Sequence, residues 1–171
     1  MTLFDVVVGL GANLGDRRQM LVRAVAGLQR LGRVVGVSAL YETEPVGPPQ
    51  PHYLNAAVRL KTELTPPELL ARLLELEREL GRVRRERWGP RVLDLDLLWV
   101  ADFACDSQGL TVPHPELEQR AFALLPLLDV AAEASSLEGL SYRAISMSLD
   151  RSGVRELPGT REGWLLAPSN A

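Results

Sequence analysis

The chain reads Arg-Trp-Gly-Pro-Arg-Val-Leu-Asp-Leu-Asp at residues 87–96, where a loop leads into a strand. On this strand Asp94 and Asp96 alternate with leucines, and side chains two residues apart on a strand share a face at a spacing of about 6.5 Å. Two carboxylates at that spacing repel each other unless a cation lies between them. The pair therefore predicts a divalent metal site. A solvent-facing strand edge with ordinary surface charges is the alternative.

Basic residues are dense in the loop before this strand. Five arginines fall within ten residues, namely Arg82, Arg84, Arg85, Arg87 and Arg91. Acidic metal ligands beside arginine side chains are what a polyphosphate bound with Mg²⁺ requires, so the segment favours phosphoryl-type transfer. The Trp-Gly-Pro run at 88–90 indicates a segment that folds over a ligand. A solvated loop that simply follows a helix is the alternative, because charge runs usually face solvent.

Length and composition indicate one ordinary globular domain of 171 residues, 46% hydrophobic and 24% charged. A net charge of −3 makes the arginine cluster a local feature, which argues against general nucleic-acid binding. Cys105 is the only cysteine, which excludes an internal disulfide and a thiolate metal cluster. Because we find no secretory leader and no apolar stretch of about 18 residues, we expect a cytoplasmic protein without membrane contact.

Hydrophobic periodicity predicts how strands and helices follow one another. Strands are expected at 4–10, 34–41, 52–61 and 92–100, and helices at 16–31 and 66–80. This β-α-β-β-α-β order predicts an α+β fold, a ferredoxin-like antiparallel sheet with helices packed on one face. A further helix is expected at 121–134. We expect a single domain over 1–171, with a core at about 3–134 and a C-terminal elaboration at 135–171.

Three further features are candidates for function. On the strand at 52–61, Tyr53 and Asn55 share the face opposite the apolar one, where they could stack on a flat ring and match the edge of an amide-like heterocycle. The wet side of an antiparallel sheet is the simpler interpretation. His114 lies between prolines and is more typical of loop hydrogen bonding than of catalysis. The glycine-rich stretch at 9–15 lacks the spacing of a dinucleotide-binding loop.

Seven sequence blocks, taken together and in order, carry a family resemblance. They are Gly-Ala-Asn-Leu-Gly-Asp (11–16), Tyr-Glu-Thr-Glu-Pro-Val-Gly (41–47), Tyr-Leu-Asn-Ala-Ala (53–57), Gly-Arg-Val-Arg (81–84), the block at 87–96, Leu-Thr-Val-Pro-His (110–114) and Arg-Ala-Phe (120–122). Over roughly residues 6–128 the chain closely resembles the 6-hydroxymethyl-7,8-dihydropterin pyrophosphokinase family. The block at 87–96 resembles the signature of that family.

The resemblance implies an ATP-dependent enzyme of folate synthesis that makes dihydropterin pyrophosphate and AMP. By this resemblance, Asp94 and Asp96 would bridge two Mg²⁺ ions on the ATP phosphates. The implied catalytic residues are Arg82, Arg91, Asp94 and Asp96. The implied ATP site consists of Glu77, Arg82, Arg84, Trp88, Arg91, Leu97, Thr111, His114 and Arg120. The implied pterin site consists of Thr43, Pro45, Val46, Tyr53, Asn55, Asp94 and Phe122.

The resemblance also implies small-molecule substrates, no nucleic-acid or membrane partner, and a monomer. Gly109 stands where the family often has a basic residue, so one phosphate contact is expected to be absent or to come from another arginine. Two other classes stay open at this point. One is a ferredoxin-like regulatory or RNA-binding module, although Phe4, Phe103 and Phe122 do not cluster as such a module requires. The other is a nucleotidyltransferase that uses the Asp-x-Asp pair.

Overall fold

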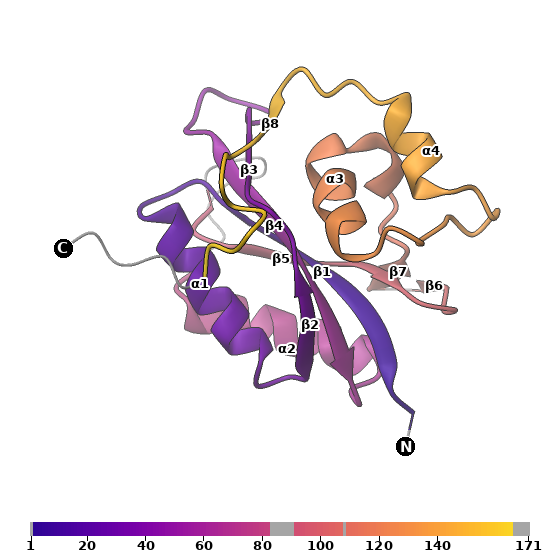
Figure 1. Cartoon of the computed structure of the whole chain (residues 1–171). Helices are drawn as coiled ribbons and strands as arrows, with labels where there is room; N and C mark the ends of the chain where they lie inside the picture. Colours follow the sequence, from indigo (N-terminus) through magenta and orange to yellow (C-terminus); the bar gives the residue numbers. More distant parts are fainter. Residues whose placement is uncertain (1, 83–90, 108, 166–171) are drawn as a thin grey trace.

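A computed structural model of the chain describes residues 2–82, 91–107 and 109–165 (Figure 1). Its strands are β1 (Phe4–Ala12), β2 (Arg33–Val37), β3 (Tyr41–Thr43), β4 (Tyr53–Thr62), β5 (Asp94–Val100), β6 (Cys105–Ser107), β7 (Leu110–Val112) and β8 (Val154–Glu156). Its helices are α1 (Arg17–Leu28), α2 (Pro66–Glu79), α3 (Ala121–Val130) and α4 (Tyr142–Met147), with a 3-10 turn at Leu117–Gln119. The expected mixture of an antiparallel sheet and helices is confirmed.

The main sheet has the strand order β5-β1-β4-β3-β8, with β2 paired to the other end of β4. All of these pairs are antiparallel. The strand expected at 34–41 is divided into β2 and β3, because the backbone at 38–40 leaves the ladder. Strands β6 and β7 form a separate hairpin.

The two faces of the sheet carry separate apolar clusters. Val6 and Val8 pack with leucines of α1 and α2 on one face, and this cluster forms the larger core. Val7, Ala57 and Leu98 point the other way and pack against α3. The two helices expected at 16–31 and 66–80 therefore share one face, as predicted, and α3 covers the other face. Successive apolar residues in β1 leave both faces in need of cover, and Figure 1 shows α1 and α2 on one side of the sheet and α3 and α4 on the other.

The helix starts follow the local sequence. The Asp16 side chain accepts a hydrogen bond from the Gln19 amide and caps α1. The α2 helix begins with a capping box of Thr65 and Glu68, and proline occupies its first positions. These signals fix where each helix leaves the sheet, and so they set the positions of the loops at 13–16 and 63–65.

The C-terminal region is part of the packed structure, although its sequence shows no periodicity. After α4 the chain forms β8 at the edge of the sheet and then continues toward α1 (Figure 1). Trp164 is 1% exposed and belongs to the larger core. Its indole Nε1 donates a hydrogen bond of 2.8 Å to the Ser38 carbonyl. The C-terminal region therefore packs against residues 38–40, where the strand pairing is interrupted.

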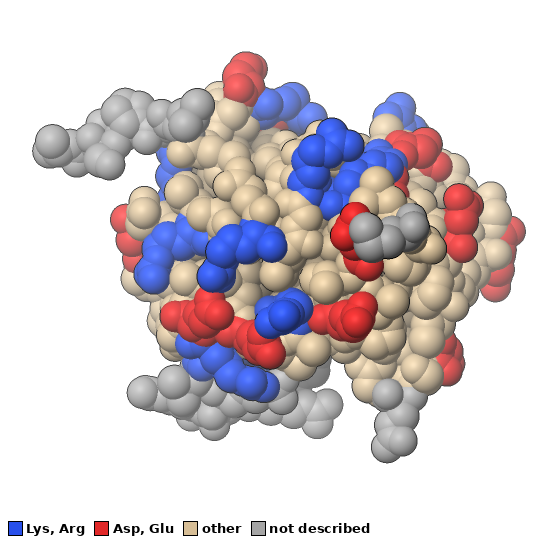
Figure 2. All heavy atoms as spheres, turned by 90° about the horizontal axis from the view of Figure 1, so that it is seen from below, with Lys and Arg blue, Asp and Glu red and all other residues tan. Residues whose placement is uncertain are grey.

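In the ranges that the structure describes, we find no helix with the length and apolar character needed to cross a bilayer. On the face shown in Figure 2, Lys and Arg side chains are interspersed with Asp and Glu side chains. Among the described residues, this face therefore shows no continuous basic surface of the kind that binds nucleic-acid backbones.

Candidate functional site

A cavity of about 630 Å³ opens on the face of the sheet that carries α3. Strands β1, β4 and β5 form its floor, and the start of α3 forms one side. The segments at 43–46 and 150–154 form another side. All seven residues that the resemblance assigns to the pterin line this cavity, as do Arg91, Asp96 and Arg120.

Two glycines keep the floor of the cavity open. In the sheet register, Gly11 lies opposite Asp94 on one side and Asn55 on the other. A Cβ atom on Gly11 would lie 2.8 Å from Asn55 Oδ1, and one on Gly9 would lie 2.9 Å from Leu98 Cδ1. A larger residue at either position would therefore require the Asn55 or Leu98 side chain to move.

Asp94 and Asp96 both face the cavity from β5. Asp94 accepts hydrogen bonds from Arg91 NH1 at 3.0 and 3.1 Å, and Arg82 NH1 lies 3.0 Å from Asp94 Oδ1. The Asp96 side chain is exposed at the cavity, and the protein packed around the cavity desolvates its carboxylate. This desolvation and the negative charge of Asp94 raise the pKa of Asp96, and the charges of His114 and Arg120 oppose the shift.

Glu77 supports this group of charges from below. It lies on α2 and is only 3% exposed. One carboxylate oxygen accepts the Leu95 amide at 2.8 Å and the other accepts Arg82 NH1 at 2.5 Å. Burial raises the pKa of Glu77, whereas the Leu95 amide and Arg82 lower it. Glu77 thus joins α2 to the β5 backbone and fixes Arg82 beside Asp94.

Asn13 is a site residue that the sequence analysis did not single out. Its side chain is buried and makes three hydrogen bonds. Asn13 Oδ1 accepts the Arg91 amide at 2.8 Å, and Nδ2 donates to Gln50 Oε1 at 2.9 Å and to the Pro51 carbonyl at 3.0 Å. It therefore holds Arg91, three residues before β5, and the end of the proline-rich loop against the end of β1. The sequence shows an asparagine in a glycine-rich turn, but it does not show the hydrogen-bond partners of this residue, because they are distant along the chain.

The opposite part of the cavity suits a flat polar ring. Asn55 Nδ2 donates to Thr43 Oγ1 at 2.7 Å, which leaves Asn55 Oδ1 directed at the floor beside Gly11. Burial and the charge of Asp94 raise the pKa of Tyr53. The Arg120 guanidinium lies 5.6 Å from the centre of the Phe122 ring. Arg120 also pairs with Glu116.

The remaining residues assigned by resemblance to the ATP site are not all gathered in this cavity. Thr111 and His114 line a neighbouring hollow beside the β6–β7 hairpin, where Thr111 Oγ1 donates to Asp106 at 3.3 Å. The Leu97 side chain packs in the larger core, so only its backbone is available to a ligand. Arg84, Arg85, Arg87 and Trp88 lie outside the described residues.

The donor chemistry of this site matches a magnesium–phosphate complex better than a metal site built from protein alone. Within residues 2–82, 91–107 and 109–165, no three acidic, histidine or cysteine side chains are grouped so that they could hold a metal. Mg²⁺ commonly binds to one or two carboxylates and takes its other ligands from phosphate and water. Asp94 and Asp96 supply that number, with arginines beside them for the phosphate charge.

The fold and the cavity define an α+β protein with an acidic pair and arginines at one part of the site and aromatic and hydrogen-bonding side chains at the other. The family model described as 7,8-dihydro-6-hydroxymethylpterin-pyrophosphokinase (HPPK) matches residues 7–132. The chain therefore belongs to the HPPK family.

Individual relatives agree with this family membership. The chain is 40% identical over 157 residues to 2-amino-4-hydroxy-6-hydroxymethyldihydropteridine pyrophosphokinase of Pseudomonas aeruginosa. This match covers 90% of this chain and 97% of the relative. It is 42% identical over 151 residues to the Bacillus subtilis protein of that name, covering 86% and 87%. With the Synechocystis protein of that name it shares 44% identity over 132 residues, 74% of this chain and 66% of the relative.

Solved structures are similar in fold at low sequence identity. A crystal structure described as HPPK-DHPS in complex with substrates superposes with a TM-score of 0.70 at 12% identity. The match covers 86% of this chain and 43% of that one, so the chain spans less than half of the solved protein. A Plasmodium falciparum HPPK-DHPS structure gives a TM-score of 0.66 at 14% identity, with 85% and 45% covered. These matches show the fold.

Proposed function

We propose that this chain transfers a pyrophosphoryl group from ATP to the hydroxymethyl group of 6-hydroxymethyl-7,8-dihydropterin and releases AMP, as a step of folate synthesis. One observation carries the proposal: a single cavity combines the Asp94–Asp96 pair and Arg91 with Tyr53, Asn55 and Phe122. Both reactants of such a transfer have a matching part of the cavity. Membership of the HPPK family supports the same reaction.

We assign the phosphate end of the cavity to ATP. Asp94 and Asp96 would hold two Mg²⁺ ions, which when bound neutralise phosphate charge and lower the pKa of the substrate hydroxyl. Arg82 and Arg91 now pair with Asp94, and on ATP binding they would turn to the phosphate oxygens. Glu77 keeps Arg82 in place, and Arg120 approaches from α3. Arg84, Trp88, Leu97, Thr111 and His114 stay assigned to ATP by resemblance alone.

The ring end of the cavity would orient the acceptor. Tyr53 and Phe122 offer aromatic surfaces, and Asn55 and Thr43 offer hydrogen-bonding groups for the pterin edge. Pro45 and Val46 form part of the adjoining wall. In-line displacement at the β-phosphorus needs position and charge neutralisation more than a covalent nucleophile. The side chains present supply both.

Several finer properties belong to the same proposal. The order β5-β1-β4 with β2 and β3 together beyond β4, and helices between strands, supports a ferredoxin-like topology to which β8 is added. We assign one catalytic domain to the chain, with residues after 134 as an integral elaboration. We also propose that the chain is a monomer in the cytoplasm and acts only on small molecules.

Product analysis tests the function. Incubation with ATP, Mg²⁺ and the reduced pterin alcohol should release AMP and pterin diphosphate, and chelation of the metal should stop it. Release of pyrophosphate would instead indicate nucleotidyl transfer, and absence of any product would indicate a binding module. Asp96→Asn should lower turnover by orders of magnitude. Glu63→Gln is the control, because Glu63 is exposed and lies outside the cavity.

A further inference from the structure

The wall of the cavity at 150–154 lies outside the part of the chain that the family model matches. Asp150, Ser152, Gly153 and Val154 line the same cavity as Tyr53 and Asn55, whereas the family match ends at residue 132. The sequence analysis assigned no role to this segment. Its position beside the proposed pterin site makes it a candidate for choosing what the cavity accepts.

Main-chain pairing joins this segment to the assigned pterin loop. In the register of β3 and β8, Val154 lies opposite Thr43 and Arg155 lies opposite Glu42. The Glu44 amide then donates to the Gly153 carbonyl at 3.0 Å. The segments 43–46 and 150–154 are therefore two sides of one hydrogen-bonded ribbon, so a change in one shifts the other.

The chain after β8 anchors this ribbon to the larger core. The Leu157 amide donates to the Leu40 carbonyl at 2.8 Å, and the Leu40 amide donates to Thr160 Oγ1 at 3.0 Å. Trp164 then enters the core and bonds to the Ser38 carbonyl. The Ser38 carbonyl and both backbone groups of Leu40 thus find their partners in the C-terminal region, as buried backbone groups require.

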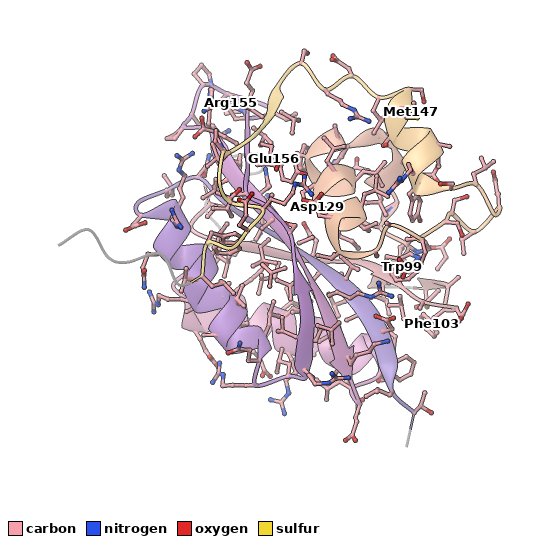
Figure 3. The ribbon with its side chains drawn as sticks, viewed as in Figure 1. Trp99, Phe103, Asp129, Met147, Arg155 and Glu156 are labelled. Carbon is pink, nitrogen blue, oxygen red and sulfur yellow. The ribbon has the colours of Figure 1, made fainter. Side chains whose placement is uncertain are left out.

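A side-chain network joins the same ribbon to α3, the helix that carries Phe122. Arg161 NH1 donates to Asp129 Oδ1 at 3.0 Å and Arg161 NH2 donates to Glu156 Oε2 at 2.7 Å. Tyr41 donates to Asp129 Oδ2 at 2.9 Å. Figure 3 shows Asp129 on α3 and Glu156 on β8 where these elements approach each other. Strands β3 and β8 and helix α3, which flank the cavity, are therefore linked to one another.

Resting on the proposed function, we infer that residues 150–154 are a specificity-determining wall of the pterin site, held in position by the C-terminal region. Ser152 is exposed at this wall and Gly153 has no side chain, so the wall leaves room for a ring of limited size. Larger side chains here exclude the pterin without touching the Asp94–Asp96 end. The segment acts on the acceptor substrate and not on ATP.

Two serines in the same region give a matched test. Ser152→Trp places a large side chain in the cavity, whereas Ser148→Trp places one on the exposed end of α4 and outside the cavity. The dissociation constant of the reduced pterin alcohol is measured by titration in the presence of Mg²⁺ and a non-hydrolysable ATP analogue. We expect Ser152→Trp to weaken pterin binding by about tenfold or more, and the affinity for the analogue alone to change by less than about twofold. Ser148→Trp should leave both unchanged.

Arg161→Gln tests the anchoring separately. This change removes the bonds to Asp129 and Glu156, so the KM for the pterin should rise while the KM for ATP stays the same. Arg30→Gln, which removes an exposed ion pair with Glu79, is its control. Equal losses of pterin and ATP binding, or pterin binding unaffected by both Ser152→Trp and Arg161→Gln, would overturn the inference. AMP release by the wild-type protein would show that the proposed function holds even if the inference about residues 150–154 fails.

Discussion

Removal of the Glu77 carboxylate tests the buried hydrogen bonds that support Arg82 and β5 beneath the site. Glu77 is 3% exposed, and the Arg82 side chain that it holds is 10% exposed. In Glu77→Ala the Leu95 amide loses its acceptor, which costs about 1–3 kcal/mol when the donor stays buried. Arg82 also loses one of its two carboxylate partners. We therefore expect a total loss of about 3–5 kcal/mol in the free energy of unfolding.

Glu77→Gln separates the two contributions. The amide oxygen of glutamine can still accept the Leu95 N–H, so the loss is confined to the charged hydrogen bond with Arg82. That loss should be about 1.5–3 kcal/mol. Glu75→Gln is the control, because Glu75 lies on the same helix with half of its side chain exposed and pairs with the exposed Arg72. Its effect should stay within about 0.5 kcal/mol.

Urea unfolding measures these differences as shifts in the midpoint at constant m value. The order of stability should be wild type, then Glu77→Gln, then Glu77→Ala. If Glu77→Ala lost less than about 1 kcal/mol, the buried bonds to Leu95 and Arg82 would not carry the stability assigned to them. Equal losses in both variants would show that the Leu95 amide finds another acceptor.

Three further outcomes are expected. Arg91→Ala should lower kcat more than it weakens pterin binding, because Arg91 pairs with Asp94 at the phosphate end; equal losses in kinetics and in a binding titration would indicate a structural role. Asn13→Ala should raise the KM values of both substrates, since it frees the Arg91 backbone and the end of the proline-rich loop together, and an Asn13→Asp variant should not restore the Nδ2 bonds. The hydrogen bond from Arg59 lowers the pKa of the Asp5 carboxyl group in the folded protein. The ionised carboxylate therefore stabilises the fold at a pH above the unfolded pKa of about 4. This stabilisation is lost as the pH falls through the pKa of the folded state. Asp5→Asn should therefore be destabilising at pH 7 and nearly neutral in acid-unfolding measurements made below the lowered pKa of folded Asp5.

Elements with local signals could be predicted from the sequence. Capping by Thr65 and Glu68 locates the start of α2, and alternation in β4 assigns Leu54 to the core. The alternation did not show that the other face is also covered, because Tyr53 and Arg59 make it look polar. Its cover depends on α3, which lies far away along the chain. Ala57, fully buried between these polar residues, was the available signal.

The candidate site could be predicted where charged residues lie close together in the sequence, and not where a residue's partners are distant along the chain. The Asp94–Asp96 pair follows from a spacing of two on one strand. The role of Asn13 depends on partners 37, 38 and 78 residues away, and no pattern near Asn13 indicates them. Strand β8 has three residues, too few for periodicity, and its partner β3 lies more than a hundred positions earlier. The sequence shows Trp164 as a large apolar residue, but it does not show which part of the core this side chain enters.

Strand β8 also has a consequence for the solubility of the folded chain. It covers the outer side of β3 and presents Arg155 and Glu156, and short charged strands of this kind discourage the docking of another sheet. A version of the chain that stopped before Val154 would leave the amides and carbonyls of β3 open to any extended strand nearby. Such a truncation should precipitate at concentrations where the intact chain stays dispersed.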